Sequence, residues 1–186
     1  MTELLTLARD AGFEETTPLQ AAQLVFRPEV RDMCRADRCS SYGKSWCCPP
    51  ACPSLEEMTR RMWDYGQGVL VETVGTMADD FDYEAMMEAE ARHKERFRQL
   101  TQALYHRYGR ENVLPMGAGT CRRCARCTYP DAPCRFPEEQ VVSMEAYGLL
   151  VSQVCQDCGA VYYHGPRTMT YVSCIFLRRG AEDGNK

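Results

Sequence analysis

Cysteine is the residue type that gives this sequence its chemistry. The chain has 186 residues, 12 of them cysteine, and nine of these gather in two short stretches. Five lie between residues 34 and 52 and four between residues 121 and 134, whereas residues 53–120 contain none. We expect a cytoplasmic protein, for reasons given below, and thiols stay reduced in the cytoplasm. Clustered thiols there indicate metal binding, redox chemistry or catalysis, and not a disulfide framework. We therefore expect two cysteine-rich, metal-binding loops, at residues 34–52 and 119–137.

The second loop has the spacing Cys121-x2-Cys124-x2-Cys127-x6-Cys134. Three thiols at consecutive spacings of this kind can converge from one tight loop on a 4Fe–4S cluster, as in the bacterial ferredoxin motif. Cys134 would complete this site or reach a neighbouring one. Zinc also takes four cysteines, but its usual signature is two separated C-x2-C pairs. We favour a 4Fe–4S cluster and keep zinc as the alternative.

The first loop contains more thiols than one site needs. Adjacent cysteines rarely bind one metal because their side chains diverge, so we expect one of Cys47 and Cys48 to be a spectator. Pro49 and Pro50 stiffen the backbone after this pair, which suits a ligand at Cys48. The favoured ligands are Cys34, Cys39 and Cys48, with Cys52 as the fourth.

These segments resemble the signatures of a family of small cysteine-rich proteins that are predicted to bind metal and are common in anaerobes. The resemblance rests on Cys34 to Pro50, with Tyr42-Gly43-Lys44-Ser45-Trp46 inside it, on the second cysteine run through Pro137, and on Met144-Glu145-Ala146-Tyr147-Gly148. It extends from about Arg31 to Leu177. The resemblance implies metal binding, of the iron–sulphur kind, and no particular reaction. Cys47 stands where the family more usually has a small polar residue.

Three cysteines remain outside the two loops. Cys155-x2-Cys158 allows three interpretations: free thiols, a third metal site that borrows Cys174, or a redox-active dithiol. A position near the end of a predicted helix weighs against the dithiol, because thiol pKa values fall at helix N-termini. Cys174 lies in an apolar strand and is most simply a core residue.

Helices and strands must position these loops. Hydrophobic periodicity and a capping box at residues 54–57 predict helices over 4–11, 55–65, 79–109 and 143–154. Runs of β-branched and aromatic residues predict strands over 24–26, 69–74, 161–163 and 170–177. We expect one domain over residues 1–186 with an α+β or small α/β fold, in which helices flank a short central sheet, and a flexible tail over 180–186.

Charge and composition exclude several classes of protein. A net charge of −4 argues against a general nucleic-acid binder, which needs a basic surface. No stretch is apolar enough for a transmembrane helix, and residues 1–10 lack the apolar core of a signal peptide, so we expect a cytoplasmic protein. The arginines of the second loop suit a redox partner protein or a small anionic substrate.

Three functions remain open from the sequence. The first is a cytoplasmic iron–sulphur protein with two 4Fe–4S clusters that acts in electron transfer. The second is an enzyme in which three cysteines hold a cluster and leave one iron open to a substrate, for sulphur transfer, desulphurisation or dehydration. The third is an interaction module that zinc stabilises.

Overall fold

The fold is a four-stranded antiparallel sheet with helices and long loops packed on its two faces. The computed structural model describes residues 1–181. Its helices are α1 (Thr2–Asp10), α2 (Pro28–Arg35), α3 (Leu55–Met62), α4 (Tyr83–Tyr108) and α5 (Val151–Cys158). Its strands are β1 (Glu15–Gln20), β2 (Tyr65–Thr76), β3 (Val113–Met116) and β4 (Thr168–Arg178), in the sheet order β1-β2-β4-β3. The α+β fold is thereby confirmed.

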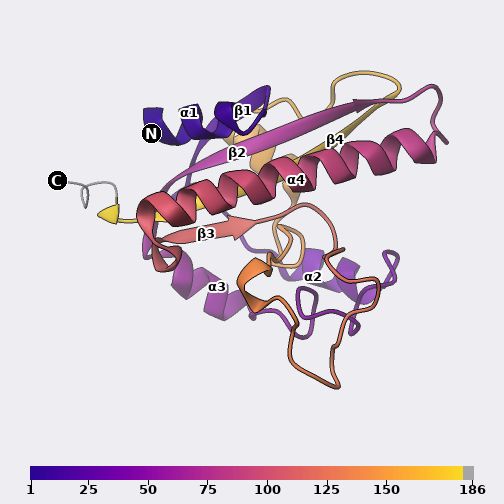
Figure 1. The fold of residues 1–186 in the computed structure, drawn as a ribbon, viewed down its shortest axis with the longest axis horizontal. Coiled ribbons are helices and arrows are strands. Elements are labelled where there is room, and N and C mark those ends of the chain that lie inside the picture. The colour runs from indigo at the N-terminus through magenta and orange to yellow at the C-terminus, as the bar shows by residue number, and fades with distance from the viewer. Residues whose placement is uncertain (182–186) are drawn as a thin grey trace.

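The two faces of the sheet carry different partners because successive side chains of a strand point to opposite faces. Val69, Val71 and Ile175 pack with the buried residues of α1 and α4. Leu70, Cys174 and their neighbours on β2 and β4 face the other side, where α3, α5 and the turn around Met144 cover them. Figure 1 shows α4 running along the sheet and the two cysteine-rich segments lying together beyond β3. The sheet thus separates a helical layer from a layer made mostly of loops.

Helix α4 is the longest element, and its bounds follow from its sequence. The Asp82 carboxylate accepts a hydrogen bond from the Ala85 N–H at 3.1 Å and caps the first turn, so the helix begins at Tyr83, four residues later than expected. Gly109 ends it with a positive φ of 80°. Phe97, Leu100 and Leu104 form a buried stripe at the helical spacing from which this helix was predicted. Within residues 1–181, no helix is both long and apolar enough to cross a membrane.

Several predicted elements differ from the structure. Residues 24–26 form no strand, since Phe26 makes only an isolated bridge to Leu149, and Pro28 opens α2 because proline is tolerated in a first helical turn. The helix expected over 143–154 begins only at residue 151. Gly148 adopts a φ of +84° and an added Cβ would lie 2.5 Å from Leu55, so residues 143–150 form turns instead. Residues 161–163 form no strand, and residues 182–186 of the expected tail lie outside the described residues.

The capping box of α3 is confirmed and gives a first prediction. The Glu57 N–H donates to the Ser54 hydroxyl at 3.2 Å, and the Ser54 N–H donates to the Glu57 carboxylate at 2.7 Å. Ser54→Ala should lower the free energy of unfolding by about 1 kcal/mol in a denaturant titration, because one helix N–H loses its partner. Ser152→Ala, at an exposed site in α5, should change little. Equal effects of both substitutions would contradict this assignment.

Candidate metal centre

The two cysteine-rich loops pack against each other. The Trp46 indole N–H donates to the Ala132 carbonyl at 3.1 Å, and its ring meets Tyr129 edge-on with centroids 4.9 Å apart. The ends of the second loop are held by backbone bonds from Gly117 to Val142 at 2.9 Å and from Met144 to Gly117 at 3.0 Å. In Figure 1 the two segments lie side by side, in purple and orange. Two segments far apart in sequence therefore lie in one region of the structure.

Four of the predicted ligands form what we call the first cysteine group: Cys34, Cys39, Cys48 and Cys52. The Cys48 thiol lies within electrostatic range of the other three, so the structure brings these four residues together. Burial raises the pKa of Cys48 to about 11, and like-charge repulsion from the neighbouring thiolates adds to this effect. Burial likewise raises the pKa of Cys34, and Glu145 adds to it. Four ionised thiols here would need a compensating cation.

Arg31, on α2, ties the first cysteine group to the rest of the fold. Its guanidinium donates to the Cys52 sulphur at 3.2 Å and to the Pro53 carbonyl at 3.2 and 3.1 Å. It also donates to the Ala146 carbonyl. One side chain thus joins α2, the end of the first loop and the turn over residues 143–150. Burial raises the pKa of Cys52, and Arg31 opposes that rise by favouring the thiolate.

A buried carboxylate beside this group lacks a full set of partners. Glu145 lies near Cys34, burial raises its pKa, and its Oε2 atom has no hydrogen-bond partner in the described structure. Unpaired buried carboxylates are costly, and proteins compensate for them with hydrogen bonds, cations or protonation. The four thiols are the donors that fit a metal here. Four thiolates would leave such a centre negative overall, so the raised pKa of Glu145 favours its protonated, uncharged form beside it.

The remaining four predicted ligands gather around a second cavity, joined there by a fifth thiol. Cys121, Cys124, Cys127, Cys134 and Cys47 line a cavity of about 250 Å³, and we call these five residues the second cysteine group. The Cys47 thiol donates a hydrogen bond to the Cys121 sulphur, which lowers the pKa of Cys121 to about 6 and raises that of Cys47. Sequence reasoning missed this contact, because nothing in the spacing of Cys47 points to the second loop.

Backbone N–H groups point at the sulphurs of the second cysteine group. The Phe136 N–H donates to Cys134 Sγ at 3.4 Å. Burial would raise the pKa of Cys127, but the backbone N–H groups of Tyr129 and Trp46 outweigh it and lower the pKa. Such N–H···S bonds stabilise thiolates and tune the metal centres that thiolates hold. This set of donors fits a thiolate-bound metal.

Cys47 and Cys48 serve different groups although they are adjacent in sequence. Cys48 belongs to the first cysteine group, whereas Cys47 contacts Cys121 in the second. The divergence of neighbouring side chains directs the two thiols toward different groups, and the expectation that one of the pair is no ligand stays a prediction. Both are buried, with 3% of Cys47 and 6% of Cys48 exposed. A single peptide bond therefore links the two cysteine groups.

Neither group forms a ready-made site for a single ion. Among residues 1–181, no three or more cysteine, histidine, aspartate or glutamate side chains are arranged so that they could hold a metal ion. Direct coordination of one zinc ion requires sulphurs about 2.3 Å from a common centre. Bringing either group to that geometry would require the loops or their side chains to move.

The last three cysteines lie near a buried carboxylate and a histidine. Cys155 Sγ is 3.8 Å from Glu72 Oε1, and His164 Nε2 is 3.8 Å from Glu72 Oε2. Cys158 and Cys174 are close to Cys155, and Cys174 is fully buried, as predicted for a core residue. Burial, with Glu72 as a further cause, raises the pKa of Cys155 to about 12. Burial raises the pKa of Cys155 and of Cys158, the last residue of α5, so this pair does not suit a reactive dithiol.

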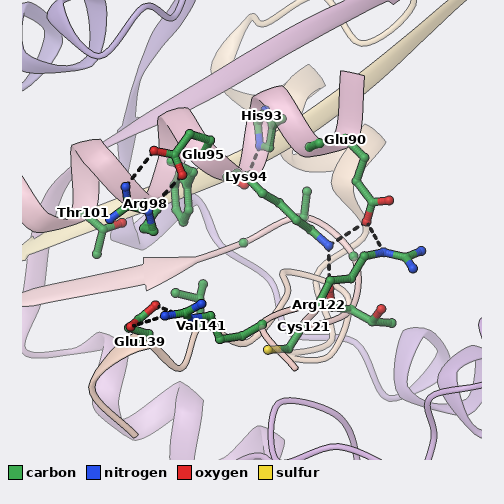
Figure 2. Close-up of a pocket in the computed structure, with 18 of the residues that line it drawn as sticks. Glu90, His93, Lys94, Glu95, Arg98, Thr101, Cys121, Arg122, Glu139 and Val141 are labelled. Carbon is green, nitrogen blue, oxygen red and sulfur yellow. Dashed lines mark hydrogen bonds and ion pairs between the residues drawn. The ribbon is translucent and has the colours of Figure 1, made fainter. Parts of the chain in front are cut away.

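A larger cavity adjoins the second cysteine group. It has a volume of about 820 Å³, and Cys121 lines both cavities. Figure 2 shows it between α4, which carries Glu90, Lys94 and Thr101, and the segments that carry Cys121 and Val141. The sequence offered no signal for it, because its wall combines one helix with two separate stretches of loop.

Comparison with known proteins supports the metal-binding character of this chain. Neither the curated proteins nor the solved structures contain a match. A family model does match, over residues 17–177, which include both cysteine groups; the family is DUF2284, described as a predicted metal-binding protein. The match covers most of the chain and agrees with the resemblance stated from the sequence. The chain therefore belongs to the DUF2284 family of predicted metal-binding proteins.

Proposed function

We propose that this protein holds two 4Fe–4S clusters, one in each cysteine group, and passes single electrons between partners. One observation carries the proposal: nine thiols gather in two groups that meet at the adjacent residues Cys47 and Cys48. A structural zinc site has no use for so many thiols, whereas two neighbouring clusters use most of them. When bound, such clusters supply one-electron chemistry at a potential that the protein sets.

The side chains and backbone around the thiols have identifiable roles in this proposal. Cys34, Cys39, Cys48 and Cys52 are the ligands of the first site, and Cys121, Cys124, Cys127 and Cys134 are those of the second. Arg31, next to Cys52, and the Phe136 N–H, next to Cys134, stabilise negative charge on the sulphurs. Added negative charge on reduction is thereby stabilised, which raises the potential.

The Cys47–Cys48 pair connects the two sites covalently. Cys48 is a ligand of the first site, and Cys47 contacts a ligand of the second through its hydrogen bond to Cys121. An electron moving between the sites would cross one peptide unit and one S–H···S contact. Burial of both cysteines excludes water from this path, which limits solvent reorganisation.

The catalytic alternative gains support from the larger cavity. A molecule in that cavity would lie beside Cys121, at the edge of the second cysteine group. An enzyme that activates a substrate at an open metal position requires such access. The discriminating result is the number of cysteines that the second site needs. If Cys134→Ala keeps its metal, the second site has an open position and catalysis is favoured over simple electron transfer.

Metal analysis tests the proposal directly. Protein purified anaerobically should contain about eight iron and eight acid-labile sulphide per chain, as two 4Fe–4S clusters require. Cys39→Ala and Cys124→Ala, which change one group each, should each lose about half of both. Cys174→Ala, in the core outside both groups, is the matched control and should keep the full content. Zinc without sulphide in the purified protein would refute the proposal and favour the zinc-stabilised module.

Cys47 provides a separate test, because it contacts a ligand without being one in this scheme. Cys47→Ala should retain about eight iron per chain, since four other thiols serve the second site. The reduction potential of the second cluster should become more negative in this variant, because Cys121 loses a hydrogen bond that stabilises the reduced state. A redox titration followed by electron paramagnetic resonance measures the shift. Loss of half the iron would instead make Cys47 a ligand.

A further inference from the structure

We propose that the larger cavity binds a small organic acid, with a carboxylate at the Lys94–Arg122 end and a hydrogen-bonding group at the Thr101 end. This inference goes beyond the proposed function and does not depend on metal. The cavity volume of about 820 Å³ falls in the range of small-molecule sites, which are about 300–1,000 Å³. Its apolar lining includes Phe97, Ala118 and Val141. The argument rests on charge at one end and on an unpartnered hydroxyl at the other.

Positive charge exceeds negative charge at the first end. The Glu90 carboxylate is only 10% exposed, and its Oε1 accepts hydrogen bonds from Lys94 Nζ at 2.6 Å and from Arg122 Nε at 3.1 Å. One carboxylate thus serves two cations, and Figure 2 shows both reaching the same oxygen. Arg122 uses only its Nε in this pair, so its two terminal nitrogens are left for another acceptor. A carboxylate matches that planar pair of donors.

The other charged residues around the cavity are already paired. Arg98 and Glu95 form an ion pair at 2.7 Å, as do Arg123 and Glu139 at 2.7 Å. Arg110 and Glu138 pair at 3.0 Å. Each of these pairs is neutral as a whole. The positive charge left uncompensated along the described wall is therefore the one shared by Lys94 and Arg122, and an anion would balance it.

Thr101 supplies the second contact point. It is 4% exposed, it lines the cavity, and its Oγ1 has no hydrogen-bond partner within the described residues. Buried hydroxyls normally have partners, so an unpaired one in a cavity wall indicates a ligand or water as its partner. Thr101 follows Lys94 by two helical turns, or about 10 Å along α4. An elongated acid with an apolar middle spans this distance.

A rigid probe with this pattern tests the assignment. The probe is 4′-hydroxybiphenyl-4-carboxylate, a biphenyl that carries a hydroxyl at one end and a carboxylate at the other. Isothermal titration calorimetry on the full chain should detect binding. Arg122→Gln should weaken binding about tenfold, because a charged hydrogen bond is lost. Thr101→Val, which keeps the shape of the side chain, should weaken it about fivefold.

Three controls make the result decisive. Arg178→Gln breaks the exposed ion pair between Arg178 and Asp64, two residues that do not line the cavity, and should change affinity less than twofold. An analogue with a primary amine in place of the carboxylate should bind at least tenfold more weakly. Thermal unfolding of each variant establishes that it is folded. We expect Arg122→Gln to fold normally, because 55% of the Arg122 side chain is exposed. No binding of the acid, or equal affinities of the parent, Arg122→Gln and Thr101→Val proteins, would overturn the proposal whether or not the protein holds iron.

Discussion

The structure depends on a constraint at a single dipeptide. Consecutive side chains diverge, so Cys47 and Cys48 cannot both point into one cavity, and the fold places a cysteine group on each side of them. Trp46 holds this arrangement from the preceding position by its bond to Ala132 in the other loop. The two groups are therefore parts of one interlocked unit. A change in the path of either loop would disturb both.

The sheet provides the rigid support on which this unit rests. Cys174 and Phe176, on β4, face the loop layer and are fully buried. Met144 packs against the same surface, and the turn that contains it receives the Arg31 guanidinium at Ala146. On the opposite face, His93 of α4 bonds to Thr73 Oγ1 at 3.0 Å and to Ser173 Oγ at 2.7 Å. Burial lowers the pKa of His93 to about 3, so it is a neutral structural residue that ties the helix to two strands.

Local patterns could be predicted from the sequence, and contacts between distant segments could not. The capping box at Ser54, the β-branched core of β2 and the buried stripe of α4 each depend on neighbouring residues, and each was found. Strand β1 was missed because Pro18 and its polar neighbours do not resemble a strand interior, although proline is tolerated on an edge strand such as this one. The role of Cys47 was missed for a different reason. Its partner, Cys121, is brought to it only by the packing of two loops.

Lys94 connects the larger cavity with the second cysteine group. It donates to Glu90, in the wall of the larger cavity, and to the Thr120 carbonyl at 2.6 Å, one residue before Cys121. An anion that attracts Lys94 would weaken the hydrogen bond from Lys94 to the Thr120 carbonyl and thereby shift the second loop. In the proposed scheme, linkage works in both directions: if the anion stabilises one redox state of a centre in the second cysteine group, that redox state strengthens the binding of the anion by the same free energy.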